Sequence, residues 1–283
     1  MTSRAGLATA GLLAPPLHEV DADTLARVRA ALEAGVADAT AGLGHGDVVE
    51  LGLHQLRRAR YRPELLALPD EPFAWKPAFV RRSLGLELVR ACATGRFRGP
   101  ADAVGPVTDQ AVEEWRRTGR RSFHWEPWLT GLGRGARAVV HAEAVAWATP
   151  LWAAFDWTGL AGVVEFAVPY DTWNCPAARP LRLRGRSEVR VGSPPDRPSL
   201  VSVASGCPGD GWRDELAFLA LVSALADPGR PAVSRVIGLW PESGYRLVVD
   251  VDGTTLAGAV DRVVDAVAVS AAVWSSVEPV AVA

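Results

Sequence analysis

The fold is decided by the stretch LRLRGRSEVRVGSPPDRPSLVSVASG, residues 181–206, which has the pattern of two β-strands joined by a proline-containing turn. In its first half, charged residues at the even positions alternate with apolar and small residues. Successive side chains of a strand point to opposite faces, so this alternation predicts one apolar face and one face with four arginines around Glu188. The arginines are Arg182, Arg184, Arg186 and Arg190.

This row of charges has two interpretations. In the first, Glu188 is a metal ligand, or the arginines bind the phosphates of a nucleic acid. In the second, the row is a solvated strand face on which Glu188 reduces the repulsion between Arg186 and Arg190. The residues alone favour the second interpretation, because flanking arginines repel a metal cation.

The rest of the chain divides into a helical first half and an α/β second half. Residues 1–20 include the interruption APP and predict a mobile leader, and residues 21–158 have mostly helical periodicity. Residues 159–283 carry runs bounded by Gly, Pro, Asn or Asp that predict the order β-β-β-α-β-β-α. We therefore expect an α/β protein with a helical N-terminal portion packed on its core.

Several element ends have recognisable signals. Asp23 and Thr24 are the expected caps of a helix over residues 21–40, and Pro77 and Gly95 are expected to bound the next clear helix. Further helices are predicted over residues 109–118, 135–157 with a kink at Pro150, 212–227 and 254–274. The sequence PESG, residues 241–244, predicts a turn between two strands.

Composition limits the classes of function. The 283 residues are 49% hydrophobic, enough for a sizeable core, and the net charge of −2 argues against a broad basic surface for duplex DNA. The three cysteines stand far apart without a C-x-x-C motif, so neither a disulfide framework nor a zinc ribbon is indicated. A reduced, cytoplasmic setting fits best, and no run has the length of a membrane span.

The order of motifs in the second half resembles a known nuclease family. Glu165 lies on one predicted strand, RGRSEVRV on the next, SLVSVASG on the third and RDELAFLALVSAL on the following helix. This order resembles the RecB-like branch of the PD-(D/E)XK nucleases, whose second strand carries GRIDxV, whose third carries VVDxKTG and whose helix carries Q-L-x-x-Y. The resemblance spans roughly residues 49–267. It implies a restriction-endonuclease-like core, a mixed sheet flanked by helices.

The resemblance also implies that the catalytic groups are missing. That chemistry needs carboxylates to hold Mg²⁺ and a lysine to position or activate the attacking water. Glu188 occupies the place of the second-strand acid, but Ser202 stands at the third-strand acid and Ala204 at the lysine. Lys76 is the only lysine of the chain and lies far upstream. We therefore expect no metal and no other cofactor.

The helical motifs have changed as well. Val89 stands four residues after Gly85, where the family has a histidine. Glu215 and Leu219 replace the glutamine and the tyrosine of the last motif. These changes are typical of a pseudo-enzyme that has kept the packing pattern of the fold.

A second group of arginines lies in the helical half. Arg116, Arg117, Arg120 and Arg121 stand close to the aromatic sequence HWEPW, residues 124–128. They either form a solvated helix end, because cations near its C-terminus stabilise a helix, or form a local track for single-stranded nucleic acid or RNA. The tryptophans of HWEPW could correspondingly be core residues or contacts in a loop.

Three functions follow from these patterns. The leading expectation is a catalytically inactive, nuclease-like protein that acts in DNA processing as an accessory factor and binds single-stranded nucleic acid or a partner protein. The first alternative is an active Mg²⁺-dependent nuclease whose missing groups come from Glu165, Asp171 or Glu215, with an arginine in place of the lysine. The second alternative is an interaction protein that binds no nucleic acid.

Overall fold

The computed structural model describes residues 19–41, 49–68, 74–119, 125–166, 168–175, 181–192, 197–227 and 229–276, together with residues 9, 11, 12, 14 and 17. The helices are α2 (Ala22–Ala39), α3 (Leu53–Tyr61), the 3₁₀ helix η1 (Pro63–Ala67), α4 (Pro77–Ala93), α5 (Pro100–Thr118), α6 (Glu126–Gly131), α7 (Arg134–Ala154), α8 (Trp212–Ala226) and α9 (Gly253–Ser276). The strands are β1 (Val49–Leu51), β2 (Val164–Phe166), β3 (Asp171–Asn174), β4 (Leu181–Gly185), β5 (Val189–Val191), β6 (Ser199–Val203), β7 (Arg235–Trp240) and β8 (Tyr245–Asp250). The protein is therefore of the α/β class.

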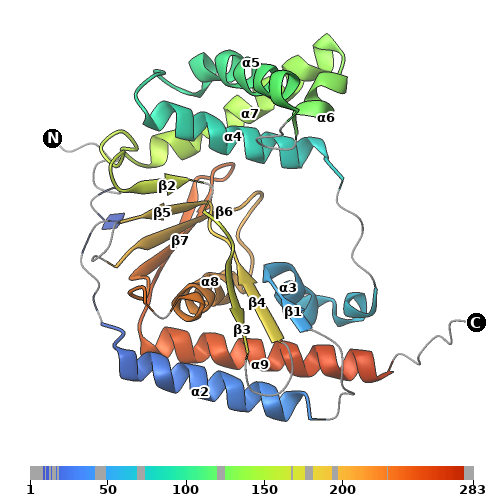
Figure 1. Cartoon of the computed structure of the whole chain (residues 1–283), viewed down its shortest axis with the longest axis vertical. Coiled ribbons are helices and arrows are strands. Elements are labelled where there is room, and N and C mark those ends of the chain that lie inside the picture. The colour runs from blue at the N-terminus through green and yellow to red at the C-terminus, as the bar shows by residue number, and fades with distance from the viewer. Residues whose placement is uncertain are drawn as a thin grey trace, which may run out of the picture.

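The strands form two mixed sheets flanked by helices (Figure 1). The larger sheet has the order β2-β5-β6-β7-β8 and the smaller one the order β1-β4-β3. In the larger sheet β2, β5 and β6 are antiparallel neighbours, β6 and β7 are parallel, and β7 and β8 form a hairpin. The parallel pair is joined through α8, as a parallel connection requires a crossover.

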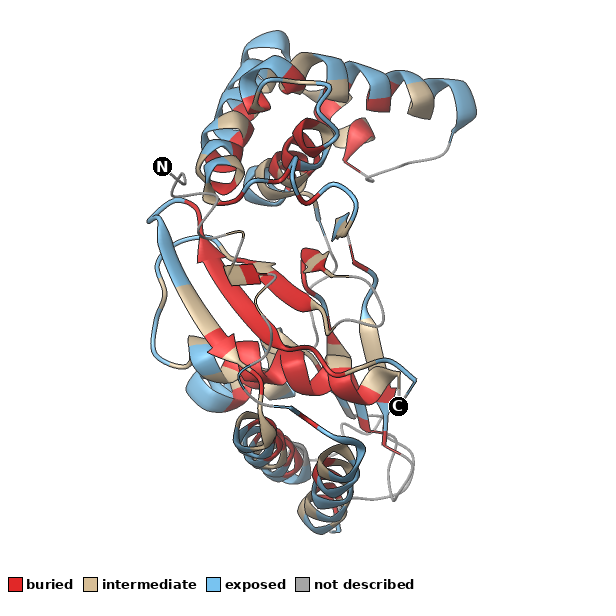
Figure 2. Cartoon of the chain, turned by 90° about the vertical axis from the view of Figure 1, so that its left-hand side faces the viewer, coloured by how far each residue is buried: buried red, intermediate tan, exposed pale blue. Residues whose placement is uncertain are grey.

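The larger sheet separates two apolar cores. On β6 and β7, Val201 and Ile237 pack with helices α4–α7, whereas Leu200 and Val236 pack with α8, α9 and α2. The alternation of side chains along each strand thus divides its residues between the two cores. Figure 1 shows α4–α7 beyond one side of the sheet and α8, α9 and α2 on the other. Figure 2 shows that buried residues concentrate in the central strands and the helix beneath them.

Elements before residue 159 contribute to both cores. Residues of α2, β1 and α3 pack with α8 and α9, whereas α4–α7 pack on the opposite face of the larger sheet. The described part of the first twenty residues also contacts the core: Leu12 is buried, and its carbonyl oxygen accepts a hydrogen bond from Ser199 at 2.8 Å. No described helix combines the length and apolar character that a membrane span requires.

Several local predictions are confirmed. Helix α4 begins at Pro77, and Gly95 follows its end with a φ of 76°, a conformation that glycine adopts without strain. The turn at residues 241–244 joins β7 to β8. The predicted caps of α2 are wrong, because the side chain of Asp21 accepts the hydrogen bond from the backbone N–H of Thr24 at 2.7 Å.

The single strand predicted over residues 181–191 is wrong. Its first part is β4, in the smaller sheet, and its last part is β5, in the larger sheet. Residues 186–188 connect the two and belong to neither strand. The alternation of charged and apolar residues continues through this connection, so the sequence pattern does not reveal it. A further strand, β3, pairs with β4 and was not predicted.

Candidate functional site

A large cavity brings together the main positions of the nuclease-like motif. It has a volume of about 1600 Å³, and Glu188, Ser202 and Ala204 are among its lining residues. The lining comes from α3, α4, the beginning of α6, the ends of β2, β4 and β6, and the beginning of α8. We call this space the arginine cavity. Its lining includes residues of α4 and residues of α3, β1 and β4, elements that Figure 1 labels.

Charged side chains dominate one part of this lining. The arginines are Arg57 on α3, Arg81, Arg82 and Arg90 on α4, Arg184 on β4, and Arg186 directly after β4. The carboxylates are Glu50, Glu87 and Glu188. Six guanidinium groups therefore face three carboxyl groups in the lining. The surface of the cavity is positive although the whole chain is slightly acidic.

Five of these arginines bind a carboxylate. The pairs are Arg57–Glu215, Arg81–Glu242, Arg82–Glu188, Arg90–Glu87 and Arg184–Glu50. Glu215 and Glu242 lie outside the lining. When they are counted together with the three carboxylates of the lining, the six arginines exceed the acids by one positive charge, that of Arg186. Arg186 is exposed and forms no ion pair with any described residue. An ion pair uses one or two of the five N–H donors of a guanidinium, so a paired arginine can still donate to a phosphate oxygen.

Aromatic rings line the same cavity. They are Trp75, Phe79, Trp128, Phe166, Tyr170 and Trp212. Phe79 and Tyr170 are 45% and 53% exposed, high values for large apolar or amphipathic rings. The guanidinium carbon of Arg184 lies 4.5 Å from the ring centroid of Tyr170, and that of Arg186 lies 5.5 Å from the same centroid. Cations and accessible rings are thus interleaved, an arrangement that suits unpaired nucleobases and their phosphates.

Glu188 does not stand in an exposed row of arginines. The residue is only 8% exposed, and one carboxylate oxygen accepts a hydrogen bond from Arg82 of α4. The other oxygen accepts one from the backbone N–H of Val203 at 2.7 Å. The expectation that Glu188 reduces repulsion between Arg186 and Arg190 is therefore wrong. The chain turns between β4 and β5, and this turn places the acid against α4.

Arg190 also leaves the predicted row. Its guanidinium lies 3.2 Å from a carboxylate oxygen of Asp171 and 3.9 Å from one of Glu165, and its side chain is largely buried. Glu165 is its cross-strand neighbour in the β2–β5 pairing. Two acids considered as replacement metal ligands thus bind an arginine instead. Of the predicted row, Arg182 and Arg184 are on β4, where both lie within 4 Å of Glu50.

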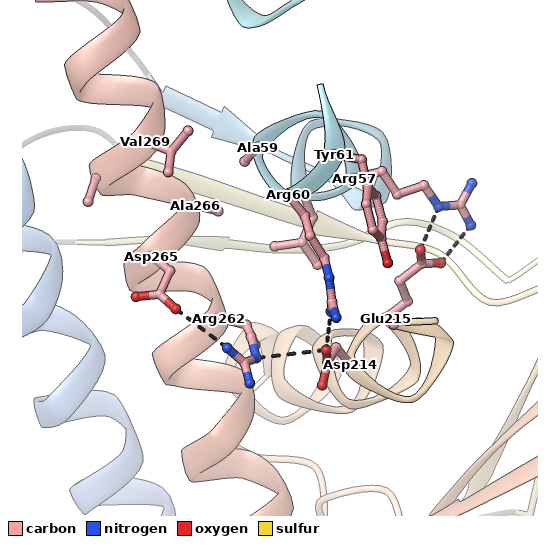
Figure 3. A pocket seen from close by; sticks show the side chains of 13 residues that line it. Arg57, Ala59, Arg60, Tyr61, Asp214, Glu215, Arg262, Asp265, Ala266 and Val269 are labelled. Atoms are coloured by element: carbon pink, nitrogen blue, oxygen red, sulfur yellow. Dashed lines mark hydrogen bonds and ion pairs between the residues drawn. The ribbon is translucent and has the colours of Figure 1, made fainter. Parts of the chain in front are cut away.

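The helical positions of the motif have structural partners. Val89 is fully buried among the residues packed with α4–α7, and Leu219 is buried in α8 beneath β4. The carboxylate of Glu215 binds Arg57 through two hydrogen bonds of 2.6 Å (Figure 3). None of these three residues lines the arginine cavity.

A second, smaller space lies between α3, α8 and α9, with a volume of about 520 Å³. Figure 3 shows Arg60 and Arg262 directed at Asp214, while a second nitrogen of Arg262 faces Asp265. The remaining lining is largely small aliphatic side chains. We call it the ion-paired pocket, because its arginines and acids are matched in number.

The second predicted group of arginines lies apart from the cavity. Arg116 and Arg117 are exposed at the end of α5, and Arg117 binds Glu114 at 2.6 Å. Arg120 and Arg121 lie outside the described residues. In the neighbouring HWEPW sequence, Trp125 is fully buried, whereas Trp128 lines the arginine cavity.

The residues present do not fit a magnesium site. Both oxygens of Glu188 are engaged by N–H donors, and neither Ser202 nor Ala204 offers a carboxylate. Within the described ranges, no three or more Asp, Glu, His or Cys residues form a group that could hold a metal ion. Mg²⁺ prefers carboxylates and water in octahedral geometry, and a guanidinium bound to the one acid repels it.

One carboxyl group of the cavity is perturbed. Burial raises the pKa of Glu87 above its usual value, and the nearby Arg90 partly offsets this effect. Glu87 therefore carries a charge that is costly to maintain in the folded protein. Its neutralisation would make the cavity more positive.

Sequence reasoning missed the contribution of α4. Phe79, Arg82, Leu86 and Arg90 line the cavity at spacings of three and four residues, which places them on one face of the helix. The buried residues Val80, Leu84 and Leu88 follow a different line of the same helix. A stripe that combines arginine with exposed aromatic and aliphatic residues was the available signal.

Comparison with known sequences gives no family assignment. No protein-family model matches the chain, and no curated protein matches it significantly.

Proposed function

We propose that this chain is a non-catalytic, nuclease-like protein that binds single-stranded nucleic acid in the arginine cavity. The observation that carries the proposal is the lining itself, in which six arginines and six aromatic rings surround the position of the motif's one remaining acid. Arginines supply donors for phosphate oxygens, and rings supply faces on which bases stack.

The arrangement of strands supports the relation to the RecB-like branch of the PD-(D/E)XK nucleases. Strands β2, β5 and β6 are neighbours in the order that the resemblance implies, and α8 follows β6 directly. Glu188 lies directly before β5 and Ser202 lies on the neighbouring strand β6, close to where the family has its second- and third-strand acids. The loss of the other catalytic groups supports a role in binding rather than cleavage.

Two features favour a single strand over a duplex. A net charge of −2 argues against a broad basic surface, whereas the cavity lining offers a local concentration of arginines. Exposed rings such as Phe79 and Tyr170 can stack on bases only where the bases are unpaired.

The experiment is a titration of labelled single-stranded DNA and RNA, and of a duplex of the same sequence, followed by fluorescence anisotropy at several salt concentrations in the presence of a chelator. We expect the single strand to bind at least about tenfold more tightly than the duplex, with affinity falling as salt rises. Equal or stronger binding to the duplex, or no binding to either strand, would overturn the proposal.

A further inference from the structure

The acid that would hold a metal ion in an active site is here bound to a fixed cation. Glu188 is buried directly before β5 and accepts hydrogen bonds from Arg82 and from the backbone N–H of Val203. A buried carboxylate with two such donors is held in one orientation, and it holds Arg82 in return. The guanidinium of Arg82 is therefore the cation bound to the acid that the resemblance assigns to the metal site.

Arg82 retains donors toward the cavity. Its side chain is 41% exposed and lines the space, and among the described residues Glu188 is its only hydrogen-bond acceptor. One N–H is used, and a guanidinium has five. A planar group anchored on one side by a buried acid loses little further freedom when it binds an anion on the other.

The neighbouring strand supplies a compatible group. In the β5–β6 pairing Val189 lies opposite Val201, and the backbone N–H of Glu188 also donates to the carbonyl oxygen of Val201, the residue before Ser202. Ser202 lines the same cavity, and its hydroxyl can donate a hydrogen bond. A carboxylate at this position would repel a phosphate, whereas a hydroxyl can bind one. Ala204, also in the lining, adds no charge.

We infer that Arg82, Glu188 and Ser202 form a phosphate-binding centre, in which a guanidinium replaces the metal cation and one phosphodiester of the bound strand is the ligand. This inference rests on the proposed function and adds the group that fixes the strand in the cavity. Arg82 binds the phosphate, Ser202 donates a second hydrogen bond, and Glu188 is a positioning residue that orients Arg82.

The test uses conservative variants of the full chain and the anisotropy of labelled single-stranded oligothymidylate. Arg82→Lys keeps the charge but loses the planar fork, so we expect affinity to fall about tenfold at constant salt slope. The matched variant Arg184→Lys changes an arginine whose partner, Glu50, is exposed, and we expect a loss of about twofold. Equal losses for the two variants would overturn the phosphate centre and leave the proposed function intact.

Ser202→Asp separates the anion site from a metal site. It adds a carboxylate to the cavity that Arg82 and Glu188 also line, so we expect affinity to fall about tenfold whether or not Mg²⁺ is present. Restoration of binding by Mg²⁺ would overturn the inference, because the position would then hold a cation. If Arg82→Lys fails to fold in a thermal unfolding control, Ser202→Ala replaces it, with an expected loss of about threefold. Wild-type protein that does not bind the strand would overturn the proposed function and this inference together.

Discussion

The arginine cavity and the ion-paired pocket are both lined by arginines and acids, but their charges are arranged differently. In the pocket, three arginines meet three acids, and the rest of the lining is mostly aliphatic. In the cavity, six arginines meet three acids of the lining and two acids outside it, which leaves one cation in excess, and six aromatic rings line the same space. The comparison teaches that the number of arginines does not mark a binding site. The proposed function rests instead on an excess of cations combined with accessible rings.

The ion pairs of the pocket also have an evident structural role. Arg57 and Arg60 join α3 to the first turn of α8, and Arg262 joins α9 to the same turn. In the cavity, Arg186 binds no described acid and lies only beside the ring of Tyr170. A cation that joins no elements is available to a ligand.

The largest effect is expected from removing Arg184 and Arg186, the two cavity arginines that lie beside the ring of Tyr170. The double variant Arg184→Ala/Arg186→Ala removes two phosphate contacts, so we expect the affinity for a single strand to fall about a hundredfold and the salt slope to decrease by about two. The control Arg60→Ala/Arg262→Ala removes the same charge from the ion-paired pocket. Comparable losses of affinity for the two variants, measured by fluorescence anisotropy, would contradict the proposed difference between the cavity and the pocket.

The next effect concerns stability. Arg57→Ala leaves the buried carboxylate of Glu215 without its two hydrogen bonds, so we expect the free energy of unfolding to fall by about 2 kcal/mol. Arg60→Ala breaks a more exposed pair with Asp214, and we expect a loss below about 1 kcal/mol. Denaturant unfolding of the two variants measures the difference. A larger loss for Arg60→Ala would contradict the structural role assigned to Glu215.

A smaller effect is expected at β4, the strand that carries Arg184. A Cβ added at Gly185 would lie 3.2 Å from Cβ of Val222 and 3.3 Å from Cδ2 of Leu219, both in α8. We expect Gly185→Ala to destabilise the fold by about 1 kcal/mol, because β4 must move away from α8. Gly105 lies inside α5 with open space around it, so Gly105→Ala should stabilise by about 0.5 kcal/mol. Thermal unfolding that shows the same sign for both variants would contradict the packing of β4 on α8.

The smallest effect is a dependence on pH. Because the pKa of Glu87 is raised in the folded state, the folded protein binds a proton more readily than the unfolded chain. The contribution of Glu87 to the free energy of unfolding therefore falls as pH rises from about 4.5, its pKa in the unfolded chain, through its higher pKa in the folded protein. Glu87→Gln should remove that part of the dependence and stabilise the protein at neutral pH. Denaturant unfolding between about pH 4.5 and 7 that gives parallel curves for the variant and the wild type would contradict this account.

Local signals predicted much of the fold. Pro77 and Gly95 bounded α4 correctly, and the turn at residues 241–244 joined the expected strands. These features depend on backbone preferences within a few residues. The division of residues 181–191 between two sheets could not be predicted in this way. Glu188, in the connection between β4 and β5, is bound by Arg82 from the distant helix α4 and by the backbone N–H of Val203 at the end of β6. These contacts are not visible in the local sequence.

The candidate site was predicted only in part. The sequence placed Glu188, Ser202 and Ala204 together, and they do line one cavity. Arg81 and Arg82 of α4 were missed, because nothing local shows that this helix face meets the end of β5. Arg190 of the predicted row does not line the cavity, because strand alternation places a residue on a face but does not identify its partner, here Asp171.

The central claim is that the arginine cavity binds a single strand without cutting it. The most direct measurement incubates an end-labelled single strand with the wild-type protein in Mg²⁺ or Mn²⁺, and then resolves the bound fraction on a native gel and the strand length on a denaturing gel. We expect a shifted complex that contains only full-length strand. Metal-dependent fragments that disappear in Glu188→Ala would contradict the account.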